Sequence, residues 1–356
     1  MAEPFRVGYL SDGPVVPSGA ALNPVNLRFD EALANGELDR PIEVIARAGN
    51  GLPNGTAKGV CDAFLELVDA GVLLVIGPGI TDNALAVRGL AEAHRVPTIN
   101  FSGCELTRGE FNFHWQLGSL PDEGLLLARA VRAAGLEQVA VIRDRSPIGD
   151  EYWSYFSEAA EEAGLVVTSD HKVSPVKTDM TTEVVAARKH DPDGLVYLGF
   201  GQVLIPLWQA LDSAGWKPPA FTNTAGLHWY GAPPEAKALS AGWVYVDMYD
   251  EANAVTTSVL DRFQGAYGQR PVGPMVTAFY DMASLAVHGL RRATVHTPEG
   301  VKDGLERVHQ LPAATGGPGT VQGFGPWERT ALKGADYLVL RVMGADVTTR
   351  YAGPTG

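Results

Sequence analysis

A series of short apolar runs constrains the fold of this chain most strongly. Each run ends in a glycine-rich or polar turn and is followed by a helical pattern. The clearest is Val72–Ile76, which is followed by Gly77-Pro78-Gly79 and then by a helical pattern over about 82–94. A continuous apolar run of this length is typical of a strand buried on both faces of a parallel sheet. Strands that alternate with helices in this way predict an α/β fold with parallel sheets.

The alternation occurs in two series, and each predicts one doubly wound lobe. The expected strands lie at about 5–10, 42–46, 72–76 and 98–101 in the first series, and at about 139–142, 166–168, 195–198, 220–222 and 242–246 in the second. The remaining helices and short strands are too few for a third domain, so we expect them to complete these two lobes.

Completing both lobes requires the chain to cross between them more than once, near 117–122, 247–251 and 324–328. We therefore predict two discontinuous lobes. The N-terminal lobe comprises residues 1–119 plus 251–324, and the C-terminal lobe comprises residues 120–250 plus 325–356.

Composition excludes several classes of protein. A formal net charge of −13 makes binding to nucleic acid or to an anionic membrane surface unfavourable. Two cysteines, Cys61 and Cys104, exclude a disulfide scaffold and a cysteine-rich metal site. The first residues lack the pattern of a signal peptide, which predicts a cytoplasmic protein, or an extracytoplasmic one whose leader has been removed.

No catalytic constellation can be assembled from the sequence. Gly77-Pro78-Gly79 and Gly199-Phe200-Gly201 each lack the third glycine of a dinucleotide fingerprint. A P-loop, a G-x-S-x-G motif and an H-E-x-x-H motif do not occur, and the eight histidines show no short metal-ligand spacing. We therefore expect no enzyme activity, no cofactor and no metal site.

Several motifs appear in a characteristic order: Val7–Ser11, Val75–Pro78, Val96–Asn100, Val139–Asp144 with Ile148-Gly149, Asp193–Gly199, Ala278–Asp281, and Gly325-Pro326 through Lys333-Gly334. Over nearly the whole chain this order resembles the type I periplasmic binding proteins, above all the leucine/isoleucine/valine-binding branch that serves ABC importers. The resemblance implies two flavodoxin-like lobes joined by a three-crossing hinge, with a ligand cleft between them. It also implies an ABC transporter permease as partner.

Ligands of open α/β sheets bind at the carboxyl ends of the strands, so the loops after the strands supply the candidate ligand-binding residues. They are Asp12, Ile80, Thr81, Asp82, Phe101, Ser102, Gly103, Cys104, Tyr152, Phe200, Gly201, Thr224, Ala225, His228, Trp229 and Tyr249. Thr81 and Asp82 open a helix whose N–H groups attract a carboxylate, or one of them simply caps that helix. The aromatic candidates suit a planar ligand, or simply pack.

The loop after the fourth strand of the second lobe departs from the family. Amino-acid binders of the family hold the ligand ammonium there with an acidic side chain, whereas this loop reads Asn223-Thr224-Ala225-Gly226. A buried ammonium without a counter-charge is costly. Asp12 or Glu151 are alternative sources of that charge. We expect a neutral or anionic ligand of apolar or aromatic character rather than a branched-chain amino acid.

The sequence leaves three functions open. The first is a non-catalytic binding protein that closes two lobes over a small molecule and hands it to an ABC permease. The second is a cytoplasmic sensor on the same fold, whose closed form binds or releases a regulator protein. The third, an enzyme, has no catalytic residues to support it.

Overall fold

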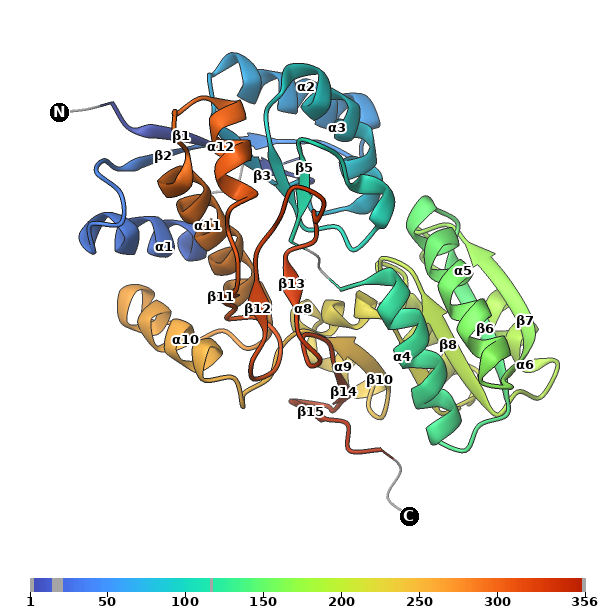
Figure 1. Cartoon of the computed structure of the whole chain (residues 1–356). Coiled ribbons are helices and arrows are strands. Elements are labelled where there is room, and N and C mark those ends of the chain that lie inside the picture. The colour runs from blue at the N-terminus through green and yellow to red at the C-terminus, as the bar shows by residue number, and fades with distance from the viewer. Residues whose placement is uncertain (1–2, 15–21, 116–117, 354–356) are drawn as a thin grey trace. The chain divides into compact units, whose positions relative to one another are not determined.

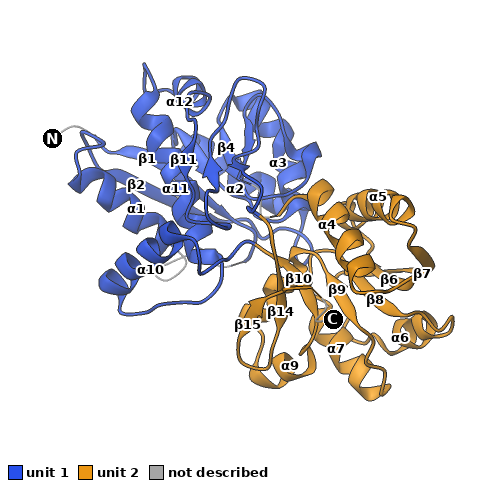
Figure 2. Cartoon of the chain, turned by 60° about the horizontal axis from the view of Figure 1, so that its bottom comes forward, with its two compact units in different colours: residues 1–117, 248–337 blue, residues 118–247, 338–356 orange. Residues whose placement is uncertain are grey.

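The computed structural model describes residues 3–14, 22–115 and 118–353. The chain divides into two compact units (Figure 2), residues 1–117 with 248–337 and residues 118–247 with 338–356, so that it crosses between them three times. The first two crossings fall near the expected positions. The third follows residue 337 instead of lying within 324–328, because a short antiparallel sheet keeps this stretch in unit 1.

Unit 1 is built on a five-stranded parallel sheet of order β2-β1-β3-β4-β5. Its strands are β1 (Phe5–Ser11), β2 (Ile42–Ala48), β3 (Leu74–Ile76), β4 (Thr98–Asn100) and β5 (Asn112–His114). All three residues of β3 are fully buried, as the apolar run predicts. The short antiparallel sheet of the same unit contains β11 (Leu311–Pro312), β12 (Val321–Gln322) and β13 (Leu332–Lys333).

Two layers of helices cover the sheet of unit 1 (Figure 1). They are α2 (Ala57–Asp69) with α3 (Thr81–His94), and α1 (Asn23–Ala34) with α10 (Ala254–Tyr267), α11 (Met275–Arg292) and α12 (Pro298–Leu305). Helix α2 shows why such segments form: the Thr56 hydroxyl caps it by accepting from the Gly59 N–H, and Val60, Phe64 and Leu67 face the core.

Unit 2 repeats the strand order in a seven-stranded mixed sheet, β15-β14-β10-β9-β8-β6-β7. Five parallel strands are β6 (Gln138–Asp144), β7 (Val166–Val173), β8 (Gly194–Leu198), β9 (Ala220–Thr222) and β10 (Val244–Asp247), and two antiparallel ones are β14 (Val339–Met343) and β15 (Thr348–Arg350). In both units the first strand therefore lies between the second and the third strand, which is the flavodoxin-like order.

Helices α4 (Leu120–Ala133) and α5 (Pro147–Glu162) lie side by side in unit 2 (Figure 1). A second layer contains α6 (Thr181–Arg188), α7 (Leu204–Ser213) and α9 (Pro234–Leu239), preceded by a 3₁₀ turn at Thr224–Leu227 and the single turn α8 (His228–Gly231). The expected α/β class, with two doubly wound lobes, is confirmed. Strands β5, β11, β13 and β15 were not expected; each is only two or three residues long and lacks a continuous apolar run.

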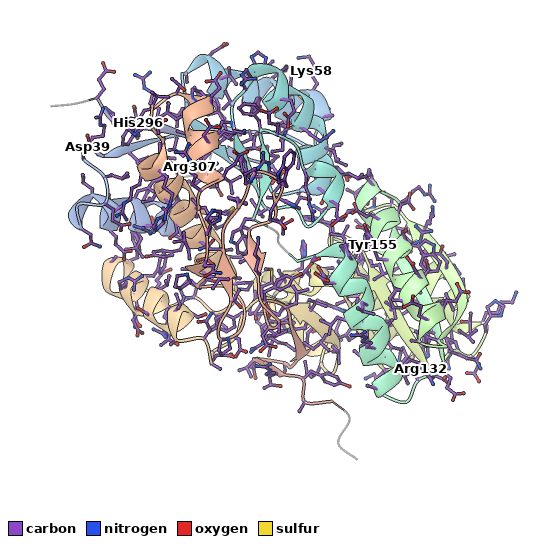
Figure 3. The ribbon with its side chains drawn as sticks, viewed as in Figure 1. Asp39, Lys58, Arg132, Tyr155, His296 and Arg307 are labelled. Atoms are coloured by element: carbon purple, nitrogen blue, oxygen red, sulfur yellow. The ribbon has the colours of Figure 1, made fainter. Side chains whose placement is uncertain are left out.

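Asp39, Lys58 and Arg307 are exposed charged side chains of unit 1 (Figure 3). Among the described residues, no helix is both long enough and apolar enough to cross a membrane.

Candidate functional site

The loops after β1 and β3 meet at the carboxyl edge of the unit 1 sheet, and Asp12 joins them. Its carboxylate accepts the N–H groups of Gly79 at 2.8 Å and Ile80 at 3.1 Å, and the Asn83 side-chain amide at 2.7 Å. Burial raises the pKa of Asp12, while these three hydrogen bonds favour its ionised form. The carboxylate therefore holds the loop before α3 in place.

Helix α3 begins without a side-chain cap. Its N-cap residue is Ile80, which cannot hydrogen-bond through its side chain, and Thr81 and Asp82 lie in the first turn. The alternative that Thr81 caps the helix is therefore wrong. Its hydroxyl oxygen lies 2.8 Å from the hydroxyl oxygen of Ser102, which follows β4. This pair is buried, with Thr81 2% and Ser102 1% exposed.

Besides Thr81, three neighbours fix the backbone and side chain of Ser102. Its N–H donates to the Asn100 side chain, its hydroxyl oxygen accepts the Cys104 N–H at 3.1 Å, and its carbonyl accepts from His114 Nδ1 at 2.9 Å. Gly103 and Cys104 are buried, so these two candidates shape the turn that presents the hydroxyl.

His114 is a site residue that the sequence analysis missed. Because the carbonyl of Ser102 can only accept, Nδ1 of His114 carries the proton, and Nε2 accepts from Arg108 Nε at 2.7 Å and from Thr330 Oγ1 at 3.0 Å. Burial, and then the charge of Arg108, lower the pKa of His114 to about 3. The ring therefore stays neutral and positions Ser102.

The Thr81–Ser102 pair has one hydroxyl proton available for a further hydrogen bond. The two hydroxyls carry two protons and share one hydrogen bond, and the other bond of Ser102 Oγ accepts from a backbone N–H. One hydroxyl proton is left over, whichever residue donates within the pair. Together with the first turn of α3, the pair forms a donor site suited to a carboxylate oxygen.

Two aromatic candidates of unit 1 differ in their surroundings. Phe101 is half-buried, packs edge-on against Phe279 at 5.5 Å, and covers Gly79 so closely that a Cβ there would lie 2.1 Å from the ring. Tyr249 instead belongs to a hydrophobic cluster with Leu27 and Phe263 of α1 and α10. Phe101 therefore lies beside the donor pair of unit 1, whereas Tyr249 is packed in a core.

In unit 2 the loops after β6 and β8 are joined as their counterparts are in unit 1. Asp144 accepts the Phe200 N–H at 2.7 Å and the Tyr197 hydroxyl at 2.6 Å. The half-buried Phe200 ring lies edge-on to His228 at 5.1 Å. Gly201 makes this approach possible, because its φ is +108° and a Cβ there would lie 2.7 Å from His228 Nδ1.

Glu123, on α4, is the second residue that the sequence analysis missed. Its fully buried carboxylate accepts from the Ser119 N–H, the Tyr152 hydroxyl, and both the N–H and the hydroxyl of Thr224. Burial raises the pKa of Glu123 to about 7, against the effect of these donors. The loop after β9 thus contains no carboxylate, but it rests on one supplied by a helix.

The remaining candidates of unit 2 lie in two places. His228 is half-buried, with Nδ1 3.2 Å from the Ala225 carbonyl, and burial lowers its pKa. Ala225 and Trp229 belong to the hydrophobic core of unit 2, where the Trp229 indole N–H donates to the Gly344 carbonyl. The structure therefore groups Tyr152 with Thr224, and Phe200 and Gly201 with His228, and leaves Trp229 in the core.

No group of three or more histidine, cysteine, aspartate or glutamate side chains among the described residues is arranged to hold a metal ion. The two cysteines, both described, do not form a disulfide.

A family model for periplasmic binding proteins matches residues 4–336. Solved structures with this fold include a leucine binding protein from Thermotoga maritima, with 16% identity, a TM-score of 0.80 and 98% of each chain covered. They also include a branched chain amino acid ABC transporter protein from Thermus thermophilus with bound valine, with 18% identity, a TM-score of 0.79 and coverage of 99% of this chain and 97% of that one.

A third similar structure is a solute binding protein of an ABC transporter from Rhodopseudomonas palustris BisB5 in complex with 3,4-dihydroxybenzoic acid. It is 16% identical, with a TM-score of 0.77 and coverage of 95% of this chain and 93% of that one. At such identities the likeness shows the fold alone. Among curated proteins, no sequence matches the chain.

Proposed function

Because the chain belongs to the type I periplasmic binding protein family, we propose that it binds a small carboxylate-bearing solute of apolar or aromatic character and delivers it to an ABC permease. The proteins to which it is similar are solute-binding proteins, and this chain has the substrate-binding fold of ABC transporters.

The proposal that the solute bears a carboxylate rests on the pair of hydroxyls on Thr81 and Ser102. Their spare proton lies at the carboxyl edge of a parallel sheet, beside the first turn of α3, where the helix dipole favours negative charge. Both residues are almost fully buried, so a charge-assisted hydrogen bond to a carboxylate is strong there.

The proposal favours a carboxylate without an ammonium over a zwitterionic amino acid, because two buried carboxylates of the chain are already hydrogen-bonded within the protein. Asp12 is held by two backbone N–H groups and a side-chain amide, and Glu123 by donors from three other residues. Neither carboxylate is left to neutralise an ammonium, and an unpaired buried ammonium is costly. A carboxylate on an otherwise uncharged molecule avoids this cost.

Two half-buried rings favour an apolar or aromatic body for the solute. Phe101 neighbours the hydroxyl pair of unit 1, and Phe200 follows β8 in unit 2. Aromatic walls suit planar ligands. The structural relative that holds 3,4-dihydroxybenzoic acid is a precedent for a benzoate on this fold, as the relative with valine is for an amino acid.

Calorimetric titration with benzoate, benzamide and leucine tests the proposal. We expect benzoate to bind, and we expect the uncharged benzamide and zwitterionic leucine to bind at least tenfold more weakly, the difference that one charge-assisted hydrogen bond supplies. Ser213→Ala, at the exposed end of α7, is the matched control for Ser102→Ala. Tight leucine binding, or equal loss of affinity in both variants, would contradict the proposal.

A further inference from the structure

We infer that Arg108 and Thr330 are positioning residues for the hydroxyl pair of unit 1: both donate to one nitrogen of His114 and thereby hold its other nitrogen against the backbone of Ser102. The inference rests on the proposed function and deepens it, because it identifies side chains beyond the hydroxyl pair that set the affinity for a carboxylate. All four residues belong to unit 1.

His114 is the last residue of β5 and is held by backbone hydrogen bonds to a segment that is distant in the sequence. Its N–H donates to the Arg329 carbonyl and its carbonyl accepts the Ala331 N–H, each at 2.9 Å, so Thr330 lies opposite it in a parallel bridge. On its other side β5 pairs with β4, the strand that Ser102 follows. The ring therefore lies between the segment that contains Thr330 and the loop that contains Ser102.

The two ring nitrogens of His114 have neighbours of opposite kinds. Nδ1 lies 2.9 Å from the Ser102 carbonyl oxygen, whereas Nε2 lies 2.7 Å from Arg108 Nε and 3.0 Å from Thr330 Oγ1. An arginine Nε can only donate, so a proton on Nε2 would set one N–H against another, in the opposite tautomer and in the imidazolium ion alike. These neighbours therefore favour a single form of the ring, with the proton on Nδ1.

The two donors to Nε2 come from segments that are hydrogen-bonded to each other. The buried guanidinium of Arg329 donates from Nε to the Gly109 carbonyl at 2.9 Å and from Nη2 to the Glu110 carbonyl at 3.1 Å. Arg329 precedes Thr330 in the chain, and Gly109 follows Arg108. The backbone positions of both donors are therefore fixed by contacts other than those with His114.

The hydrogen bond from His114 fixes one of the two peptide groups of Ser102. The Ser102 N–H donates to the Asn100 side chain at 3.1 Å and its carbonyl accepts from His114, while its hydroxyl oxygen lies 2.8 Å from that of Thr81. If the ring were free to turn, the carbonyl would lose its donor, and the hydroxyl pair would have to be ordered when the solute binds. Ordering a side chain on binding lowers affinity.

The test is a double-mutant cycle on benzoate affinity, measured by calorimetric titration at pH 8. Arg108→Met with Thr330→Val removes both donors to Nε2, and His114→Asn keeps a side-chain N–H in place of Nδ1 but does not reach either donor. We expect the paired substitution to weaken benzoate binding about tenfold in the wild type, the contribution of one hydrogen bond, and less than twofold in the His114→Asn background. Thr330→Val alone, which is nearly isosteric, should show the same pattern with about a threefold loss. Thr349→Val, at an exposed position of β15, is the matched control and should leave the affinity unchanged.

Nitrogen-15 NMR of the imidazole ring adds a measurement that needs no solute. In the wild type the Nε2 resonance of His114 should be that of a nitrogen that accepts hydrogen bonds, and the paired substitution should move it. An unchanged Nε2 resonance overturns the inference, as does a benzoate affinity that the paired substitution leaves within twofold, or an equal loss in both backgrounds, since the two residues then act without His114. Failure of the wild type to bind benzoate overturns the proposed function and the positioning role with it, while the Nε2 resonance still shows whether the two donors hold the ring.

Discussion

The hydroxyl oxygens of Thr81 and Ser102 lie 2.8 Å apart, although 21 residues separate them in the sequence. Thr81 opens α3 and Ser102 follows β4, so the parallel order β3-β4 brings them together at the carboxyl edge of the sheet. Two short loops that look unrelated in the sequence thus form one donor site with a spare proton, and this site is the basis of the proposed carboxylate binding.

His114 should remain neutral across the pH range in which the protein is folded. With its pKa lowered to about 3 by burial and by Arg108, it should show the Nδ1-protonated tautomer from pH 8 down to pH 5. Nitrogen-15 NMR of the imidazole rings measures this directly. A ring that titrates near pH 6.5, the ordinary histidine pKa, would show that the bond from His114 to the Ser102 carbonyl is not maintained in solution.

Glu123 should make the protein less stable as the pH rises from 4.5 to 7. Its pKa is about 7 when folded against a model value of 4.5, so over this interval the folded state binds more protons than the unfolded state, and stability falls as pH rises. The loss amounts to up to about 3 kcal/mol for such a shift. Asp281, whose pKa burial also raises to about 7, contributes with the same sign.

Urea unfolding of the wild type and Glu123→Gln at pH 5 and pH 8 checks this sign. The variant should be less stable than the wild type at both pH values. Its free energy of unfolding should, however, decrease less between pH 5 and pH 8 than that of the wild type. An equal fall in both proteins would show that Glu123 does not titrate in this interval. Asp281→Asn, in the other unit, serves as a comparison for a second buried carboxylate.

Gly201→Ala should destabilise unit 2 and displace the His228 ring. A Cβ at this position would lie 2.7 Å from His228 Nδ1 and 2.8 Å from the Ala225 carbonyl, on a backbone with φ of +108°. We expect a loss of about 1–3 kcal/mol. Gly231→Ala is the matched control, since a Cβ there meets nothing within 4 Å. Equal midpoints of thermal unfolding in the two variants would contradict the geometry of the β8 loop.

Asp12→Asn should loosen the loop before α3. The side-chain NH2 group of the new asparagine would face at least one of the three groups that now donate to Asp12, and two donors repel each other. The free energy of unfolding should therefore fall by about 1–3 kcal/mol. Asp62→Asn changes the same group in an exposed pair with Lys58 and should cost less than about 1 kcal/mol. Thermal unfolding compares the two, and a smaller loss for Asp12→Asn than for Asp62→Asn would be inconsistent with its role in the loop.

The sequence predicts the two sheets and the loops at their carboxyl edges, because apolar periodicity and glycine-rich turns are local signals. It does not predict His114, since β5 is three residues long and polar at both ends. It misses Glu123 because a glutamate near the start of a helix looks like an exposed charge that complements the helix dipole. Only the tertiary arrangement shows that Tyr152 and Thr224 enclose it.

Aromatic residues show a different limit of the sequence. Trp229 and Tyr249 follow strands in the order that a ligand site would require, yet they pack in the cores of units 2 and 1. Composition cannot distinguish a ring that lines a site from one that fills a core, because both bury apolar area. Phe101 and Phe200 were predicted by the same reasoning, and they are half-buried at the sheet edges.

The most direct test of the account is the affinity of benzoate for the wild type, Ser102→Ala and Ser213→Ala, measured by calorimetric titration at pH 8. The account predicts that the wild type and Ser213→Ala bind equally, and that Ser102→Ala, which cannot supply the hydroxyl that pairs with Thr81, binds at least tenfold more weakly. Benzoate binding that Ser102→Ala leaves unchanged within twofold would contradict the carboxylate site.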